Sequence, residues 1–367
     1  MRTGITNLPL HYGKAPKWLF ERMVKLSKAI TIVIVNEYGQ KEFLKRLSDP
    51  FWFQAFGCVL GFDWHSSGLT TTVLGALKEG MKENDFGIGV CGGKGKTSRK
   101  TLEEIEKMGD RFSLSDKKIN ELKYSSKMSA KIDNTALQDG YNLYHHSFIF
   151  TERGYWCVIQ QGLNPQNQYA RRYHWLSDDI KSFVDEPHKA ICCDKKEKGV
   201  LNMVAKESEE ARRISVDLVK ENPEKINKFF NNQTCLQEFF GHRIKKLHMP
   251  SSHFIINMKK INLVTLQKAY EIQPKNYEEL LSIKGMGPKT IRALALISDL
   301  IYGEPPSWED PVKFSFSHGG KDGIPYPVDK KTYDKSIEIL ERGIEEAKLG
   351  KKEKLNAIKR LENFIKT

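Results

Sequence analysis

"LYHHSFIFTERGYWCVIQQ", residues 143–161, is typical of a β-hairpin. Two runs of aromatic and β-branched residues flank a short polar segment, Thr151 to Gly154, that ends in glycine. If these four residues form the turn, Phe150 lies opposite Tyr155, and every other pair follows from that register.

A polar cluster is expected at the open end of this hairpin. The register sets His145 opposite Gln160 on one face, and Asp139 lies just upstream. Hydrolysis of a phosphodiester needs a positioned water and a base or metal ion to activate it. These three side chains therefore predict a site that holds a divalent ion or orients water. The alternative is a hydrogen-bonded core feature without chemistry.

The residues upstream of the hairpin predict an α/β domain. Residues 16–29 read as an amphipathic helix, and "AITIVIV", residues 29–35, is β-branched enough to be a buried strand. Ser66 or Ser67 is expected to cap a helix that runs to about residue 83. "FGIGVC" then predicts a short strand, and Thr101 with Glu104 a capping box.

Beyond residue 195 the pattern becomes helical and charged. The predicted fold is an α/β (α+β) N-terminal domain with a mixed sheet, followed by an all-α C-terminal region containing a helix-hairpin-helix. The expected divisions are a catalytic domain at 1–195, a helical domain at 196–303, and a linker with a C-terminal helical pair at 304–367.

Composition favours a polyanionic partner. The chain has 59 Lys and Arg against 46 Asp and Glu, a formal net charge of +13. Its six cysteines form no Cys-x-x-Cys pair and are typical of reduced thiols. The N-terminal residues contain no apolar signal segment, and the longest apolar run has only the length of a strand. We therefore expect a cytoplasmic protein without membrane insertion.

"SIKGMGPKTIRAL", residues 282–294, predicts a hairpin between two helices, spanning residues 276–302. Glycines allow a tight turn and close approach of a ligand, and Pro288 suits the first position of the second helix. The N-terminus of that helix can hold a phosphate oxygen through free N–H groups. Contacts of this kind bind DNA backbone with little sequence preference. The residues expected there are Gly285, Gly287, Lys289 and Thr290.

The hairpin segment resembles the helix-hairpin-helix modules of DNA repair proteins. Over nearly the whole chain, the sequence resembles the archaeal and bacterial domain-of-unknown-function family seven-sixty-three. The segments that carry this resemblance are "MRTGITNLPLHYGKAPKWLFERM", "DWHSSG", "GVCGGKGKTSRKT", "QDGYNLYHHSFIF" and "GGKDGIPYPVDKKTYD". The resemblance implies an intracellular protein and carries no activity.

"FGIGVCGGKGKT", residues 86–97, partly matches two phosphate-binding motifs. It does not open a helix where a dinucleotide fingerprint requires one, and its first glycine is one residue out of register for a P-loop. A basic cradle for nucleic-acid phosphates fits better, with Lys94, Lys96 and Arg99 as its cations. The alternative is a solvated basic loop.

Two further segments carry candidate residues. In "FDWHSSG", Asp63 and His65 alternate on an extended backbone, as a metal-binding or acid–base pair or as part of a helix-capping turn. In "QYARRYHWL", Arg171 and Arg172 lie among the aromatic residues Tyr169, Tyr173 and Trp175, which could stack on bases. The alternative for that segment is an element with its aromatics in the core.

The leading hypothesis is a DNA-binding, metal-dependent phosphodiesterase, a structure-selective endonuclease that uses Mg or Mn. Its expected catalytic residues are Asp63, His65, Asp139, His145 and Gln160, and all of these except the glutamine are expected metal ligands. One alternative is a base-excision glycosylase/lyase, since Lys289 and Asp310 have about the spacing of the catalytic pair in helix-hairpin-helix glycosylases. The other is a non-enzymatic DNA-binding protein.

Overall fold

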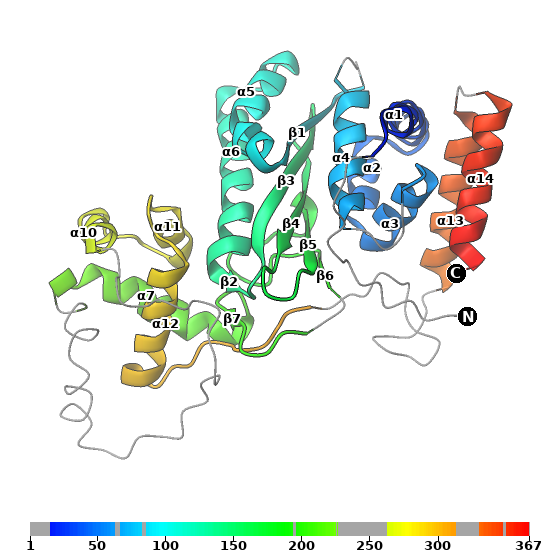
Figure 1. Cartoon of the computed structure of the whole chain (residues 1–367). Helices are drawn as coiled ribbons and strands as arrows, with labels where there is room; N and C mark the ends of the chain where they lie inside the picture. Colours follow the sequence, from blue (N-terminus) through cyan, green and yellow to red (C-terminus); the bar gives the residue numbers. More distant parts are fainter. Residues whose placement is uncertain are drawn as a thin grey trace.

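An antiparallel sheet of five strands lies at the centre of the computed structural model (Figure 1). The structure describes residues 15–62, 67–82, 86–193, 196–224, 226, 263–312, 330–347 and 350–366. The strand order is β1-β3-β4-β5-β6, and each ladder is antiparallel, whereas the expected sheet was mixed. The strands are β1 (Ile88–Lys94), β3 (Asn142–Thr151), β4 (Trp156–Leu163), β5 (Ala170–Leu176) and β6 (Ala190–Cys192).

The predicted hairpin is confirmed as β3 and β4, but its register differs by one residue. Phe150 pairs with Trp156, and the Thr151 N–H donates to the Tyr155 carbonyl at 2.9 Å. The loop has three residues because Gly154, at φ +78°, takes the left-handed position that closes such loops.

The shifted register separates two residues that were expected to share a face. His146, not His145, lies opposite Gln160, and His145 lies opposite Gln161. Because side chains alternate along a strand, His145 and Gln160 point to opposite faces of the sheet. The predicted pairing of His145 with Gln160 is therefore wrong.

The first face of the sheet is covered by α5 (Thr101–Arg111) and α6 (Asp116–Lys131). Phe148, Phe150 and Val158 belong to the hydrophobic core on this side. The predicted capping box is wrong: Lys100 is the N-cap of α5 and makes no side-chain cap. The Glu104 carboxylate instead accepts hydrogen bonds from the Gly92 N–H at 2.7 Å and the Lys78 ammonium at 2.6 Å.

The second face is covered by helices from the N-terminal part of the chain: α1 (Lys17–Tyr38), α2 (Gln40–Ser48), α3 (Pro50–Val59) and α4 (Gly68–Gly80). The predicted strand at 29–35 is wrong, because α1 continues through it. Ile30 and Ile34 extend the buried stripe of Met23 and Leu26 at helical spacing, so burial of one face outweighs β-branching. Ser67 precedes α4 without a side-chain cap.

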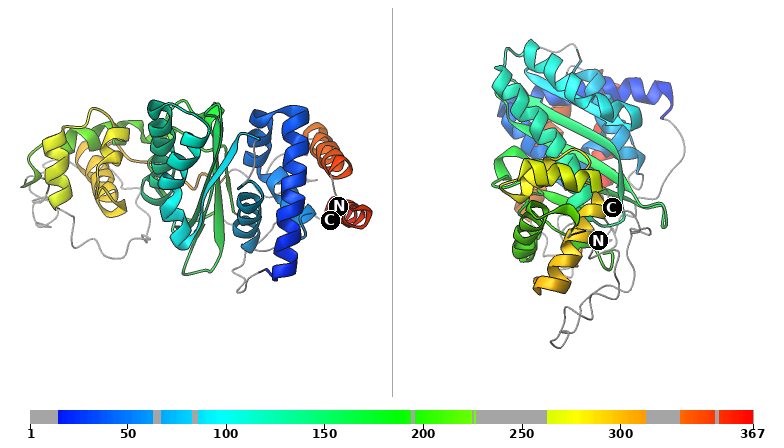
Figure 2. Two further views of the ribbon diagram at one scale, coloured as in Figure 1. Left: turned by 90° about the horizontal axis from the view of Figure 1, so that it is seen from above. Right: turned by 90° about the vertical axis from the view of Figure 1, so that its left-hand side faces the viewer.

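Helices distant in sequence complete the outer layers (Figure 2). As predicted, the chain ends in two helices, α13 (Lys330–Glu346) and α14 (Lys351–Lys366). Leu340 and Leu361 share a core with Met23, so this pair packs against α1 and α3.

On the other side of the sheet, six elements lie beside and below α6: β2 (Leu137–Gln138), β7 (Leu201–Asn202), α7 (Glu209–Lys220), α10 (Leu263–Ile272), α11 (Tyr277–Ser282) and α12 (Pro288–Tyr302). Leu280, Leu281 and Ile291 belong to the same core as Phe148. A mainly helical region therefore follows the α/β part, but it is not all-α as expected, because β7 lies within it and pairs with β2. The domain boundaries at 195 and 303 stay predictions.

The close approach of β1 to β3 gives a stability test. Gly92 lies at φ +87°, and a Cβ there would sit 2.2 Å from the His146 carbonyl oxygen across the ladder. We expect Gly92→Ala to lower the free energy of unfolding by roughly 3 kcal/mol or more. Gly95, at φ +59° with open space around it, is the matched control and should lose only about 1–2 kcal/mol. Urea denaturation measures both, and equal losses would contradict this packing.

Candidate nucleic-acid interface

The segment from the N-cap of α11 to the first turn of α12 contains a capping residue, a glycine in the left-handed region and a proline at a helix start. The Asn276 side chain caps α11 by accepting from the Glu279 N–H at 2.9 Å. Gly285 lies at φ +98°, which only glycine adopts easily, and Pro288 occupies the first turn of α12. Residues 283–289 are hereafter called the α11–α12 turn.

Internal donors occupy two carbonyl groups of this turn. The Lys131 ammonium, from the end of α6, donates to the Met286 carbonyl, and the Gln138 amide donates to the Pro288 carbonyl at 2.8 Å. Gln138 is itself held by the Arg292 guanidinium at 3.0 Å. Sequence analysis missed these three supporting residues, because no local pattern links positions 131 and 138 to a turn about 150 residues later.

The outward side of the turn is electropositive. Lys284 and Lys289 are exposed, while Met286 is buried and anchors the turn. The first N–H groups of α12 have no acceptor within the helix, and the helix dipole adds partial positive charge at this end. Thr290 was expected at the surface. Its side chain is instead buried, with 3% exposed. Only its backbone remains available for the predicted contact.

The basic glycine segment forms the end of β1 and a short 3-10 helix, η1 (Gly95–Lys100). Lys94, Lys96 and Arg99 are exposed, so the predicted cations are accessible. The predicted backbone cradle is only partly open, because the Gly92 N–H is bound by Glu104.

Arg171 and Arg172 are both fully buried, which contradicts their predicted contact with DNA. The Arg171 guanidinium binds Asp139 at 2.9 Å and Asp310 at 2.7 Å. Arg172 points to the opposite face, where it binds the Gln54 side chain at 3.0 Å. Tyr173 and Trp175, which follow them on β5, belong to the core, which was the alternative interpretation.

Arg171 also binds Asp310, the residue that the glycosylase alternative expected to be catalytic. The Asp310 carboxylate accepts from Arg171 and from the Glu197 N–H at 2.7 Å, and it is buried. Lys289 is exposed on the α11–α12 turn. The structure therefore gives Asp310 a role in an internal ion pair, and nothing in its contacts links it to Lys289.

The polar cluster of the hairpin lies inside the protein. His146 Nδ1 and the Gln160 side-chain oxygen are 2.7 Å apart, and His146 Nε2 contacts the Ser126 hydroxyl at 2.9 Å. The Gln160 amide also donates to the Asp133 carboxylate, a residue that the sequence analysis did not single out. Gln160 thus belongs to a hydrogen-bonded network between β3, β4 and the end of α6.

The remaining candidate catalytic residues do not converge on this network. On the opposite face, His145 Nε2 lies 2.9 Å from the Ser147 hydroxyl, and burial lowers the pKa of His145 to about 3. Asp139 accepts from the Tyr173 hydroxyl at 2.7 Å and from Arg171, and burial raises the pKa of its carboxyl.

Metal binding by these residues stays a prediction. Among the described residues, no group of three or more His, Cys, Asp or Glu side chains is placed to hold a metal ion. Asp63 and His65 lie outside the described residues.

Comparison with known proteins identifies a family. Residues 4–328 match the family model described as "Protein of unknown function (DUF763)", which confirms the resemblance seen in the sequence. No curated protein and no solved structure matches the chain. Within the described part of the chain, no helix is both long enough and apolar enough to span a bilayer.

The buried imidazole of His145 predicts a pH-dependent stability. Below its ordinary pKa of 6.5, the unfolded chain binds a proton that the folded chain accepts only near pH 3. The free energy of unfolding should therefore fall as the pH falls, by about 1.4 kcal/mol per pH unit for this group. His145→Gln should remove that part of the slope between pH 6 and pH 4, measured by urea denaturation.

Ser147→Ala is the matched control, since it removes the hydroxyl partner of His145 and keeps the imidazole. Its pH slope should equal that of the parent chain. Parallel curves for His145→Gln and the parent would contradict the buried, neutral state of His145.

Proposed function

We propose that this chain, which belongs to the DUF763 family, binds the sugar–phosphate backbone of DNA at the α11–α12 turn, as a helix-hairpin-helix does. The observation that carries the proposal is the pattern of hydrogen bonds around the turn. Internal donors bind the Met286 and Pro288 carbonyls, so these two acceptors are already satisfied within the protein. The exposed ammonium groups of Lys284 and Lys289 and the first N–H groups of α12 are donors that suit an anion.

The rigidity of the turn supports this binding mode. Met286 is buried, and a Cβ on Gly285 would meet the Thr265 hydroxyl of α10 at 2.6 Å, so the turn is packed on its inner side. A turn held in place before binding loses little conformational entropy when it contacts a phosphate. Backbone N–H groups then read the position of the phosphate and carry no base information.

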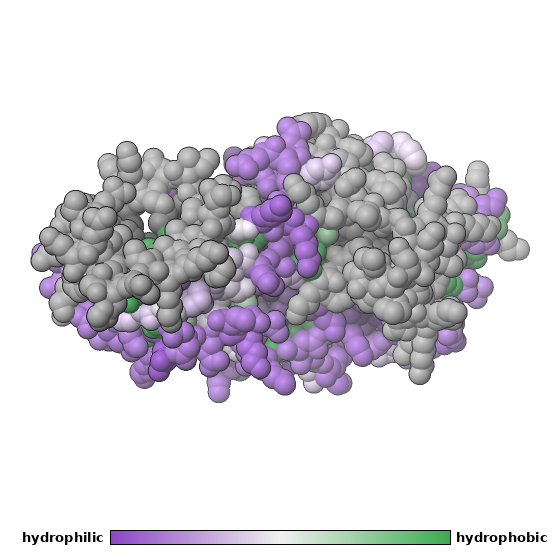
Figure 3. Space-filling view, turned by 90° about the horizontal axis from the view of Figure 1, so that it is seen from below, coloured by the Kyte–Doolittle hydropathy of each residue, from purple (hydrophilic) through white to green (hydrophobic). Residues whose placement is uncertain are grey.

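Charge and surface character support a polyanionic partner. The net charge of +13 attracts DNA at long range, and the exposed Lys94, Lys96 and Arg99 provide a second set of cations. Hydrophilic residues predominate on the described part of the face shown in Figure 3.

Reversal of charge at the turn tests the proposal. Lys289→Glu should weaken binding to duplex DNA about tenfold and reduce the salt dependence by about one phosphate contact, because it removes a cation beside the helix N-terminus. Lys117→Glu is the matched control, since Lys117 is an exposed lysine at the beginning of α6, the end opposite to the one that contacts the turn. Fluorescence anisotropy over a range of salt concentrations measures both. Equal affinities of the two variants would contradict binding at the turn.

Hydrolysis of the bound strand remains a separate proposal. It rests on Asp63 and His65 as ligands of Mg or Mn, because Asp139, His145 and Gln160 are buried and His145 and Gln160 point to opposite faces of the sheet. If the proposal is right, the chain cuts forked, flapped or single-stranded DNA when Mg or Mn is present and stops when EDTA is added. Asp63→Asn should abolish cutting and preserve binding. Intact DNA in every lane, with binding retained, would favour the non-enzymatic DNA-binding alternative.

A further inference from the structure

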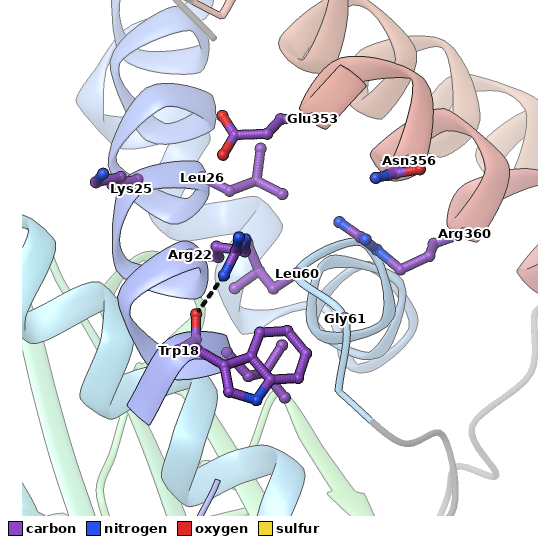
Figure 4. A pocket seen from close by; sticks show the side chains of 10 residues that line it. Trp18, Arg22, Lys25, Leu26, Leu60, Gly61, Glu353, Asn356 and Arg360 are labelled. Carbon is purple, nitrogen blue, oxygen red and sulfur yellow. Dashed lines mark hydrogen bonds between the residues drawn. The ribbon is translucent and has the colours of Figure 1, made fainter. Parts of the chain in front are cut away.

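A cavity of about 650 Å³ lies on the other side of the sheet from the α11–α12 turn (Figures 1 and 4). Its walls come from α1, from the end of α3, and from α14 near the C-terminal end of the chain. Cavities that bind small ligands commonly measure about 300–1,000 Å³. The predicted function at the turn makes no use of this space.

One wall offers an exposed aromatic ring beside a cation. Trp18 is 59% exposed although it is a large apolar residue. The Arg22 guanidinium lies 5.4 Å from its ring centroid and donates to the Trp18 carbonyl at 3.1 Å. Arg22 is thereby oriented, and much of the indole surface remains open to a planar ligand.

The opposite wall offers a second cation held in place. Arg360 of α14 uses its Nε to donate to the Val59 carbonyl at 2.8 Å. Figure 4 shows Arg22 and Arg360 extending from opposite walls toward the space between α1 and α14, with Asn356 on the same helix as Arg360. Two guanidinium groups that face one space suit the several oxygen atoms of a phosphate.

The charge balance of the lining favours an anion. Arg22, Lys25 and Arg360 contribute three cations, and Glu353 contributes one carboxylate. The rest of the lining includes Leu26 and other leucine side chains, which suit the apolar surface of a ring. The lining therefore combines a stacking surface, an apolar floor and net positive charge.

We propose that this cavity binds a nucleoside phosphate, with the base stacked on Trp18 and the phosphate between Arg22 and Arg360. A free nucleotide and the terminal nucleotide of a nucleic-acid strand present the same chemistry to such a site. The proposal does not depend on DNA binding at the α11–α12 turn, because the two regions are built from different helices on opposite sides of the sheet (Figure 2).

Isothermal titration of the full chain tests the site. The probes are adenosine monophosphate, adenosine, inorganic phosphate, and a 5′-phosphorylated single-stranded oligonucleotide. We expect the nucleotide to bind more tightly than adenosine or phosphate alone. Trp18→Ala and Arg22→Gln should each weaken nucleotide binding about tenfold, through loss of stacking and of charge.

Two substitutions serve as controls. Tyr302→Ala removes an exposed aromatic ring outside the cavity, and Arg213→Gln removes an exposed arginine on α7. Both should leave nucleotide binding unchanged. Trp18→Ala should leave duplex affinity unchanged, which separates this site from the turn. Tighter binding of the free nucleotide assigns the site to a small ligand, and tighter binding of the oligonucleotide assigns it to a strand end.

Three results would overturn the proposal. They are no binding of nucleotide or oligonucleotide by the parent chain, equal affinity for phosphate and nucleotide, and unchanged affinity in Trp18→Ala. Because the Trp18 side chain is largely at the surface, its removal should not unfold the chain. Arg360→Gln would test the second guanidinium group, but it also removes the hydrogen bond to the Val59 carbonyl. If that variant unfolds, Arg22→Gln still tests the phosphate end of the site.

Discussion

Burial of both faces of the β3–β4 hairpin is the constraint on which the rest of the fold depends. Alternate side chains must enter two separate cores, with Phe148 and Phe150 on one side and Ile149 on the other. The first core continues into α6, α11 and α12, and the second continues into α1 to α4 and the C-terminal helices. The α11–α12 turn and the helices that line the cavity therefore pack, through these two cores, on the same hairpin. They lie on opposite sides of the sheet.

Buried charge connects the chain after α12 to this sheet. Arg171 is enclosed between Asp139 and Asp310, so removal of the arginine would leave two buried carboxyl groups without their cation, at a cost of about 3–5 kcal/mol. Ser307 adds a bridge to Asn202 of β7. These contacts hold the segment that follows the C-terminal end of α12. Lys131 and Gln138 bind carbonyls at the N-terminal end of α12, so the helix is held at both ends. A fixed helix end is what backbone recognition of a phosphate needs.

The sequence predicted the features that local patterns determine, and failed where distant contacts decide. The hairpin, the strand near Val90 and the cap at Asn276 follow from alternation, turn residues and capping. The β-branched run at 29–35 became helix because its one-sided burial in the second core outweighs local preference. Arg171 and Arg172 looked like surface cations, since no local pattern reveals the aspartates and amides that enclose them. The hairpin loop has three residues instead of the expected four, and the pairing register is therefore shifted by one residue. This shift places His145 and Gln160, a predicted catalytic pair, on opposite faces of the sheet.

The central claim is that the α11–α12 turn presents N–H groups to a DNA phosphate. Hydrogen–deuterium exchange of the full chain, with and without duplex DNA, tests it most directly. The account predicts slower exchange in residues 285–290 when DNA is bound, with unchanged exchange in α14. Unchanged exchange at the turn under conditions where DNA is bound would contradict the account and place the interface elsewhere.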